Sequence, residues 1–152
     1  MTDGVLVTAG NNRIGRKIAE RLSQAGFYIY LHHHDSEIEA NETLAGLDGQ
    51  GESIMCDLSD YQQVEDMIAG LACVDNPLKH IINNASLFSA DQATDFNEQS
   101  FAAHMNINLR SPMQLARGLD KMLENSERGS VVNILDSKVF SLNADFFSYT
   151  LS

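Results

Sequence analysis

The sequence predicts an α/β domain in which a parallel β-sheet carries helices on both of its faces. Three observations support this fold class. Short apolar runs rich in β-branched residues alternate with segments whose apolar residues recur at helical spacing. The connections between these segments are short, and a glycine-rich turn directly follows the first predicted strand. The 152 residues fit one domain and can bury a core of their own.

Each element has a local signal. The apolar run GVLVT at 4–8 predicts a buried strand, and apolar residues every three or four positions over 13–25 predict a helix. Gly26 follows where a helix C-cap glycine belongs. Further strands are predicted at 27–32, 52–56, 78–83 and 129–135, and further helices at 36–47, 59–73 and 98–124. The irregular segment 87–97 follows the fourth strand, so we expect it at the carboxyl edge of the sheet, where such folds bind ligands.

The composition excludes several classes of protein. Lys and Arg number 10 against 21 Asp and Glu, which gives a net charge of −11, whereas a nucleic-acid-binding protein needs a basic patch. No apolar run could span a membrane, and the N-terminus lacks the features of a signal peptide. Cys56 and Cys73 make neither a disulfide framework nor a metal cluster, and both are expected to be buried. We therefore expect a reduced, cytoplasmic protein without a metal, a membrane or a nucleic-acid partner.

The turn between the first strand and the first helix has the composition of a phosphate-binding loop. It reads TAGNNRIG at 8–15. Small residues allow the backbone to approach a diphosphate, and Gly15 allows the helix to pack close to the strand. The helix N-terminus adds free N–H groups and a positive dipole end. A tight turn without a ligand is the alternative, because many turns have this composition.

Histidines gather at the end of the second predicted strand. The run His32, His33, His34, Asp35 and Ser36 lies where the adenosine ribose of a dinucleotide would bind. Alternate strand residues face opposite sides, so at most His32 and His34 point together, and no further cluster completes a metal site. Contact with a ribose or a phosphate is the favoured role, and solvated histidines without a role are the alternative.

Four motifs together resemble the short-chain dehydrogenase/reductase family, and within it the pteridine reductases. They are TAGNNRIG at 8–15, LHHHDS at 31–36, NNAS at 83–86, and the pair Asp136 and Tyr149 at the family's spacing. In the first motif, which resembles the family's TGxxxGxG loop, Ala9 stands at the first glycine and Arg13 replaces the middle one. The resemblance implies a Rossmann-type doubly wound sheet in three layers (αβα). Residues 1–152 would be its NAD(P)-binding domain, truncated before the last helices and strands, because family members are longer.

The resemblance also implies which residues bind the cofactor. They are Gly10, Arg13, Ile14 and Gly15 at the phosphates, His32, His34 and Ser36 around the 2′-phosphate, Asp57 and Leu58 at the adenine, and Asn84, Ala85 and Ser86 beside the nicotinamide ribose. Asp35 stands where pteridine reductases often carry arginine, and an acidic group there favours NAD(H). Arg13 and the two histidines favour NADP(H), which is the expected cofactor.

The same resemblance implies hydride transfer from NADPH to a C=N or C=O carbon, with Tyr149 as the proton donor. Asn108 matches the family's structural asparagine, which disturbs its helix and holds a water for proton relay. Phe88 matches the aromatic residue that stacks on a pterin, although an ordinary loop aromatic is the alternative. Most family members have serine at Asp136, and a carboxylate there suits a basic heterocycle that gains a proton. A pterin, dihydropterin or dihydrofolate-like substrate is therefore expected, unless a one-residue slip gives the usual role to Ser137.

Family members lower the pKa of the tyrosine with a lysine four residues later, a position directly after Ser152. We therefore expect residues 1–152 alone not to turn over substrate. Two other functions stay open: a short-chain oxidoreductase acting on a sugar, acyl or steroid carbonyl, and a non-catalytic dinucleotide-binding sensor. The resemblance further implies a homotetramer, built on helix 98–124 and on the helix that begins near Tyr149.

Overall fold

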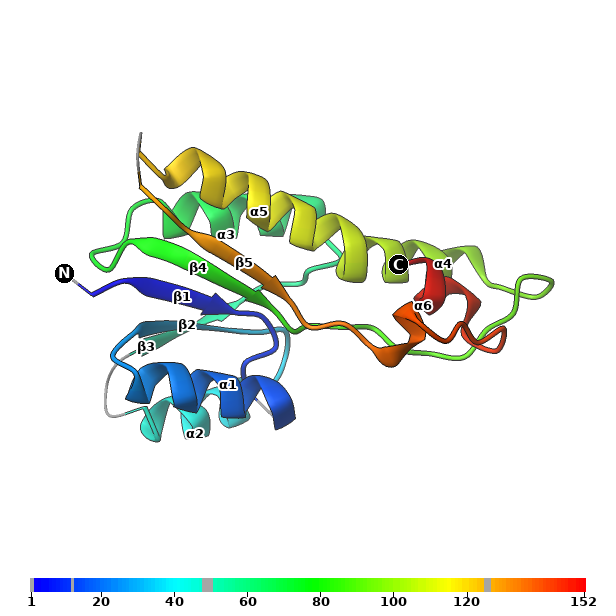
Figure 1. Cartoon of the computed structure of the whole chain (residues 1–152), viewed down its shortest axis with the longest axis horizontal. Helices are drawn as coiled ribbons and strands as arrows, with labels where there is room; N and C mark the ends of the chain where they lie inside the picture. The colour runs from blue at the N-terminus through cyan, green and yellow to red at the C-terminus, as the bar shows by residue number, and fades with distance from the viewer. Residues whose placement is uncertain (1, 12, 48–50, 125–126) are drawn as a thin grey trace.

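The computed structural model describes residues 2–11, 13–47, 51–124 and 127–152 and confirms the predicted α/β architecture (Figure 1). Within these ranges five strands form one sheet in the order β3-β2-β1-β4-β5, and every neighbouring pair is parallel. The strands are β1 (Gly4–Val7), β2 (Tyr28–His33), β3 (Gly51–Met55), β4 (Leu78–Asn83) and β5 (Ser130–Asn133). This order places β1 at the centre of the sheet, with the turn that follows it between the carboxyl ends of β2 and β4.

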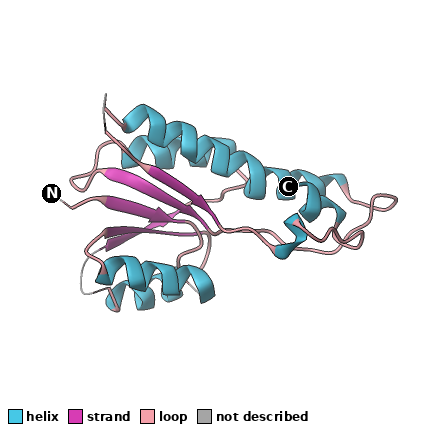
Figure 2. Cartoon of the chain, in the orientation of Figure 1, coloured by secondary structure: helices cyan, strands magenta, loops and turns pink. Residues whose placement is uncertain are grey.

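Helices cover both faces of the sheet and make it the middle of three layers (Figure 2). The α-helices of the described residues are α1 (Arg13–Gln24), α2 (Glu37–Ala45), α3 (Tyr61–Leu71), α4 (Glu98–His104), α5 (Ser111–Met122) and α6 (Phe147–Leu151). The α1 and α2 helices lie on one face, and α3 and α5 lie on the other (Figure 1). The doubly wound arrangement predicted from the alternation of elements is therefore confirmed.

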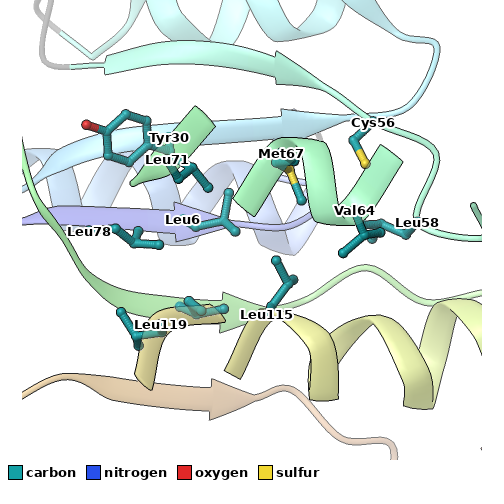
Figure 3. Close-up of a cluster of buried hydrophobic side chains, with 11 residues drawn as sticks. Leu6, Tyr30, Cys56, Leu58, Val64, Met67, Leu71, Leu78, Leu115 and Leu119 are labelled. Atoms are coloured by element: carbon teal, nitrogen blue, oxygen red, sulfur yellow. The ribbon is translucent and has the colours of Figure 1, made fainter. Parts of the chain in front are cut away.

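The strand alternation divides the buried side chains between two cores. Val5 and Val7 of β1 pack with the layer of α1 and α2, whereas Leu6 packs with the layer of α3 and α5. Figure 3 shows Leu6 among side chains that come from both helices of that second layer, including Met67 and Leu115. Because β1 is buried on both faces, its sequence is a continuous apolar run and not an alternating one.

The helix predicted over 98–124 is irregular in its middle. It comprises α4, a π-helical segment Met105–Arg110 that contains Asn108, and α5, which ends at Met122. The irregularity expected around Asn108 is thus confirmed. Pro112 is the second residue of α5 and follows the π-helical segment directly, where the hydrogen bonds already depart from the regular α-helical pattern. The π-helical segment re-aims the side chains that follow α4, which brings Asn108 to the carboxyl edge of the sheet.

Two sequence-based expectations need correction at this level. Cys56 is buried as expected, but Cys73 is exposed because it follows the end of α3 and faces away from the core. The strand predicted over 129–135 is shorter, and all four residues of β5 are exposed because nothing within the described ranges covers this edge of the sheet. No helix in the described part of the chain is long and apolar enough to cross a lipid bilayer.

Candidate active site

The segments that follow the strands meet along one edge of the sheet (Figure 1). A cavity of about 570 Å³ lies there, between the ends of β4 and β5, the π-helical segment and α6. Its lining includes several residues singled out from the sequence: Ala85, Ser86, Asn108, Asp136 and Tyr149. The turn after β1 approaches the same edge, so the structure brings together the segments from which the site was predicted.

The turn after β1 is tied to the end of β4 by a compact set of hydrogen bonds. The Thr8 hydroxyl oxygen accepts from the backbone N–H groups of Asn84 and Ala85, both at 2.9 Å. The Asn84 side-chain amide donates to the carbonyl oxygens of Thr8 at 3.1 Å and Ala9 at 3.2 Å. Asn84 therefore acts here as a brace that holds the turn, and its amide is occupied by the protein backbone.

Close packing leaves no room for side chains at the glycines of this turn. A Cβ on Gly15 would lie 2.6 Å from the Asn84 amide nitrogen, and one on Gly10 would lie 2.7 Å from a methyl carbon of Leu31. Ala9 and Arg13 adopt the left-handed region, with φ of 48° and 47°. At both of these positions the family pattern has glycine, whereas this chain has a residue with a side chain. Arg13 and Ile14 are exposed at the start of α1, while Asn12 directly before them lies outside the described residues.

His32 has a different environment from the one expected at a 2′-phosphate. Only 2% of it is exposed, and both ring nitrogens are engaged within the protein. Its Nδ1 accepts from the Ala9 N–H at 3.0 Å, and its Nε2 lies 2.9 Å from the carbonyl oxygen of Cys56. Burial lowers the pKa of His32 to about 4, so the ring is neutral at neutral pH.

The neighbouring polar groups remain accessible. His34 and Asp35 are exposed, and the Ser36 hydroxyl donates to the Asp35 carboxylate at 3.4 Å. His34 lies 3.9 Å from the Asp57 carboxylate. Partial burial raises the pKa of Asp57, but hydrogen bonds from Ser59 and the nearby histidines outweigh this and hold it below its usual value. Leu58 beside it is buried. An ionised carboxylate thus lies beside the expected adenine position.

Tyr149 and Asp136 both line the cavity, and their side chains lie beside one another. Burial raises the pKa of the Tyr149 phenol, a hydrogen bond with Ser86 lowers it, and the Asp136 carboxylate raises it further. The backbone N–H of Lys138 donates to Asp136 at 2.9 Å and lowers the pKa of this carboxyl. The Ser137 hydroxyl donates to Asp136 at 3.2 Å. Asp136 lines the cavity and acts on the Tyr149 phenol, whereas Ser137 is not among the residues that line the cavity. An anion and a protonated phenol therefore share one side of the cavity.

Phe88 lies in an aromatic cluster next to this pair. Its ring stacks on Phe146 at a centroid distance of 4.4 Å and meets the edge of Tyr149 at 4.7 Å. The Lys138 ammonium lies 5.4 Å from the Phe88 centroid and 4.8 Å from that of Phe146. The predicted substrate-stacking residue is thus beside the phenol, and half of its surface is exposed.

Asn108 connects the segments on either side of the cavity. Its Oδ1 accepts from the Leu87 N–H at 2.8 Å, and its Nδ2 donates to the Leu87 carbonyl at 3.0 Å and to the Ser152 hydroxyl at 2.9 Å. The side chain therefore braces the loop after β4 against the end of α6. The role of Asn108 in holding a water for proton relay stays a prediction.

Three contributors were not found from the sequence: Phe146, Lys138 and Asp91. The pair Phe146–Phe147 directly before the tyrosine region was a usable signal for an aromatic cluster. Asp91 lies in the loop after β4, and its carboxylate accepts from the backbone N–H of Ser148 at 2.9 Å and from the Ser148 hydroxyl. No local pattern identifies Asp91, because its partner is distant in sequence. Among the described residues no group of three or more His, Cys, Asp or Glu side chains could hold a metal ion.

Solved structures resemble this chain over its whole length but are themselves longer. "FolM Alternative dihydrofolate reductase 1" of Brucella canis, complexed with NADP, is 33% identical with a TM-score of 0.92 and matches 99% of this chain and 60% of its own. The protein of the same name from Brucella suis, also with NADP, is 33% identical with the same TM-score and matches 63% of its own chain. At 20% identity, the angucycline C-6 ketoreductase LanV supports the fold alone.

Sequence relatives and a family profile agree with this result. A 2-dehydro-3-deoxy-D-gluconate 5-dehydrogenase of Bacillus subtilis is 27% identical over 148 residues, which are 97% of this chain and 58% of that protein. The human dehydrogenase/reductase SDR family member 4 is 24% identical over 151 residues, 97% of this chain and 54% of its own. The chain thus spans little more than half of the length of these relatives. The short chain dehydrogenase profile matches residues 3–152, and the chain belongs to this family of oxidoreductases.

Proposed function

We propose that this chain forms the nucleotide-binding and proton-donating part of an NADPH-dependent reductase of a pterin, dihydropterin or dihydrofolate-like substrate. The observation that carries the proposal is the convergence of Asp136 and Tyr149 at one cavity on the carboxyl edge of the sheet, with the Phe88 ring against that of Tyr149. The name and the bound NADP of the two Brucella structures, at 33% identity, support the same substrate class and cofactor.

The turn after β1 has the features that a diphosphate requires. The glycines at 10 and 15 allow close backbone approach, and the first N–H groups of α1 have no helical partner. The exposed Arg13 guanidinium at the same turn suits bidentate contact with phosphate oxygens. These residues fit a dinucleotide, and when it is bound the nicotinamide supplies the hydride.

We propose Tyr149 as the group that delivers the proton. Its raised pKa keeps the phenol protonated at neutral pH, so a proton is available at the Oη atom. Asp136 is ionised, because the hydrogen bonds it accepts lower its pKa. A carboxylate stabilises a protonated nitrogen of the substrate and repels an oxyanion, which favours a nitrogen heterocycle over a simple ketone. Phe146 stacks on one face of the half-exposed Phe88 ring, and we propose that a planar substrate ring stacks on the other face.

The substrate proposal is tested by comparing dihydropterin, dihydrofolate and simple ketones as substrates of the full-length natural protein. We expect reduction of the heterocycles, with kcat/KM for the ketones at least about tenfold lower because Asp136 repels the oxyanion. Asp136→Ser should shift this ratio towards the ketones, and Asp136→Asn serves as a control of equal size without the charge. A ratio that does not move in either variant would contradict the role of the carboxylate.

The same assay separates the other functions. The Bacillus subtilis relative is named for a sugar-acid substrate, so preference for a sugar carbonyl would favour a different short-chain oxidoreductase. NADPH binding without turnover of any carbonyl or pterin would favour a non-catalytic sensor.

The cofactor preference is tested separately by titrating this chain with NADPH and NADH. Arg13 and His34 favour NADPH, whereas the exposed Asp35 favours NADH. We expect the smaller Kd for NADPH, and Asp35→Arg should widen the difference because it replaces a repulsive charge with an attractive one. A smaller Kd for NADH in the unmodified chain would overturn the choice of cofactor.

A further inference from the structure

His32 occupies the junction of three strand ends. It lies near the end of β2, its Nδ1 faces the turn after β1, and its Nε2 faces the residue after β3. The backbone adds two bonds at the same place: Gly10 N–H donates to the His32 carbonyl at 3.0 Å, and Cys56 N–H donates to the His33 carbonyl at 3.0 Å. A single buried ring therefore links the phosphate turn to the strand end that carries Asp57.

The two contacts determine which ring nitrogen carries the proton. The Ala9 N–H can only donate, so Nδ1 must offer its lone pair. The Cys56 carbonyl can only accept, so the proton is on Nε2. Both ring nitrogens are then satisfied, which is required of a polar group with 2% exposure.

The contact with Ala9 falls on a backbone position that needs support. Ala9 has a φ of 48°, which costs an alanine about 1–2 kcal/mol. The Asn84 amide binds the Ala9 carbonyl at 3.2 Å, so the peptide groups on both sides of Ala9 are held by side chains from other strands. Such a conformation persists only when its surroundings determine it.

We infer that His32 is a positioning residue that holds the Ala9 N–H and so keeps the turn after β1 in the shape that receives the diphosphate of the dinucleotide. The inference rests on the nucleotide-binding part of the proposed function. It replaces the direct phosphate contact expected of His32 from the sequence with an indirect effect through the turn.

Two substitutions separate the two contacts of the ring. In His32→Asn the side-chain oxygen lies where Nδ1 was and can still accept from Ala9, whereas the Cys56 contact is lost. In His32→Gln the terminal amide reaches towards Cys56 but leaves the Ala9 N–H without its acceptor. His32→Phe removes both contacts. His33 provides a matched control, because it is equally buried and its Nδ1 has no partner among the described residues.

We expect NADPH to bind His32→Asn with a Kd within about threefold of the unmodified chain, and His32→Gln and His32→Phe at least about tenfold more weakly. His33→Gln should leave the Kd within about threefold. Hydrogen exchange of the Ala9 amide should be slow in the unmodified chain and in His32→Asn, and fast in the other two His32 variants. The ¹⁵N shifts of the ring in the unmodified chain should identify a proton on Nε2.

A pH series adds a readout that a purely structural residue would not move. Protonation of Nδ1 would place a donor against the Ala9 N–H, so the protection factor of the Ala9 amide, the intrinsic exchange rate relative to the observed rate at the same pH, should fall towards pH 4 in the unmodified chain but less in His32→Asn. The groups that face the ring and also act on its charge are His33, His34 and Asp57. These groups are present in the unmodified chain and in His32→Asn, so a difference in Ala9 exchange between the two is due to His32.

Tighter NADPH binding by His32→Gln than by His32→Asn would overturn the inference, and so would a proton on Nδ1. If the unmodified chain binds no NADPH, the proposed function fails, but the ring tautomer and the Ala9 exchange rates still decide whether His32 holds the turn. If a variant does not fold, the ring tautomer of the unmodified chain still shows whether His32 accepts from the Ala9 N–H.

Discussion

Two residues of the phosphate turn, Ala9 and Arg13, adopt left-handed backbone conformations that side chains disfavour. The sequence motif indicated a phosphate turn but not this strain, because the φ angles depend on the braces that Asn84 and His32 provide. Likewise, the histidine run correctly marked the end of β2. The burial of His32 could not be predicted from the strand itself, since it depends on Cys56, the residue after β3.

The strain at position 13 leads to a prediction that separates stability from binding. Arg13→Gly removes a side chain from a φ of 47°, so the free energy of unfolding should stay equal or rise by up to about 1 kcal/mol. The same change removes the guanidinium, so the Kd for NADPH should rise about tenfold. Urea unfolding and NADPH titration measure the two effects. Loss of stability without loss of affinity would show that Arg13 serves the fold and not the phosphate.

At the element scale, α6 is held in place by the loop after β4. The Asp91 carboxylate accepts from the N–H and the hydroxyl of Ser148, the Asp91 carbonyl accepts from the Phe147 N–H at 3.1 Å, and its own N–H donates to Asp145 at 3.0 Å. Asp91 thus satisfies the free N–H groups at the start of the helix that carries Tyr149. Burial raises the pKa of Asp91, but the bonds from Ser148 outweigh this and lower it.

Removing this cap should loosen the helix that carries the phenol. Asp91→Ala leaves the buried Ser148 without its partner and should reduce the free energy of unfolding by about 1–2 kcal/mol. Asp91→Asn keeps an acceptor and should recover at least half of this loss. The lowered pKa means that the contribution is present above the usual pKa of an aspartate and is lost as the pH falls through the native value. Equal stability of both variants from pH 7 to pH 3 would refute the cap.

The elements themselves were largely predictable, because strands and helices are encoded in local periodicity. The irregular middle of the helix over 98–124 was expected at Asn108 only through the resemblance, since a shift of the helical hydrogen bonds leaves no mark on apolar spacing. The aromatic cluster of Phe88 and Phe146 and the cap by Asp91 were missed, because their partners are far apart in sequence and meet only in the folded chain.

For the whole molecule, the open edge at β5 is the dominant surface feature. All four residues of β5 are exposed, and beyond it Leu135, Phe140 and Leu142 are exposed by 70%, 94% and 76%. An uncovered strand edge beside apolar side chains favours association, whereas the net charge of −11 opposes it. The homotetramer and the cytoplasmic location expected from the sequence stay predictions.

This surface leads to a prediction for the chain in solution. We expect it to self-associate as its concentration rises, and Phe140→Ser combined with Leu142→Ser should raise the dissociation constant at least about tenfold. Ile38→Ser is the matched control, because Ile38 is 74% exposed on α2, away from β5. Sedimentation velocity measures the species present. An unchanged distribution in the double variant would mean that association, if any, uses another surface.

A crystal structure of the protein with NADP⁺ decides whether one crevice holds a nicotinamide beside Tyr149 and Asp136. We expect the diphosphate at the turn between β1 and α1, and the nicotinamide at the cavity lined by Ser86, Asp136 and Tyr149. The phenol oxygen and the reactive ring carbon should then flank a space that admits a C=N or C=O bond, with its heteroatom within about 3–3.5 Å of the phenol oxygen and its carbon within about 3–3.5 Å of the ring carbon. A nicotinamide bound elsewhere, or a phenol turned away from it, would contradict the proposed active site.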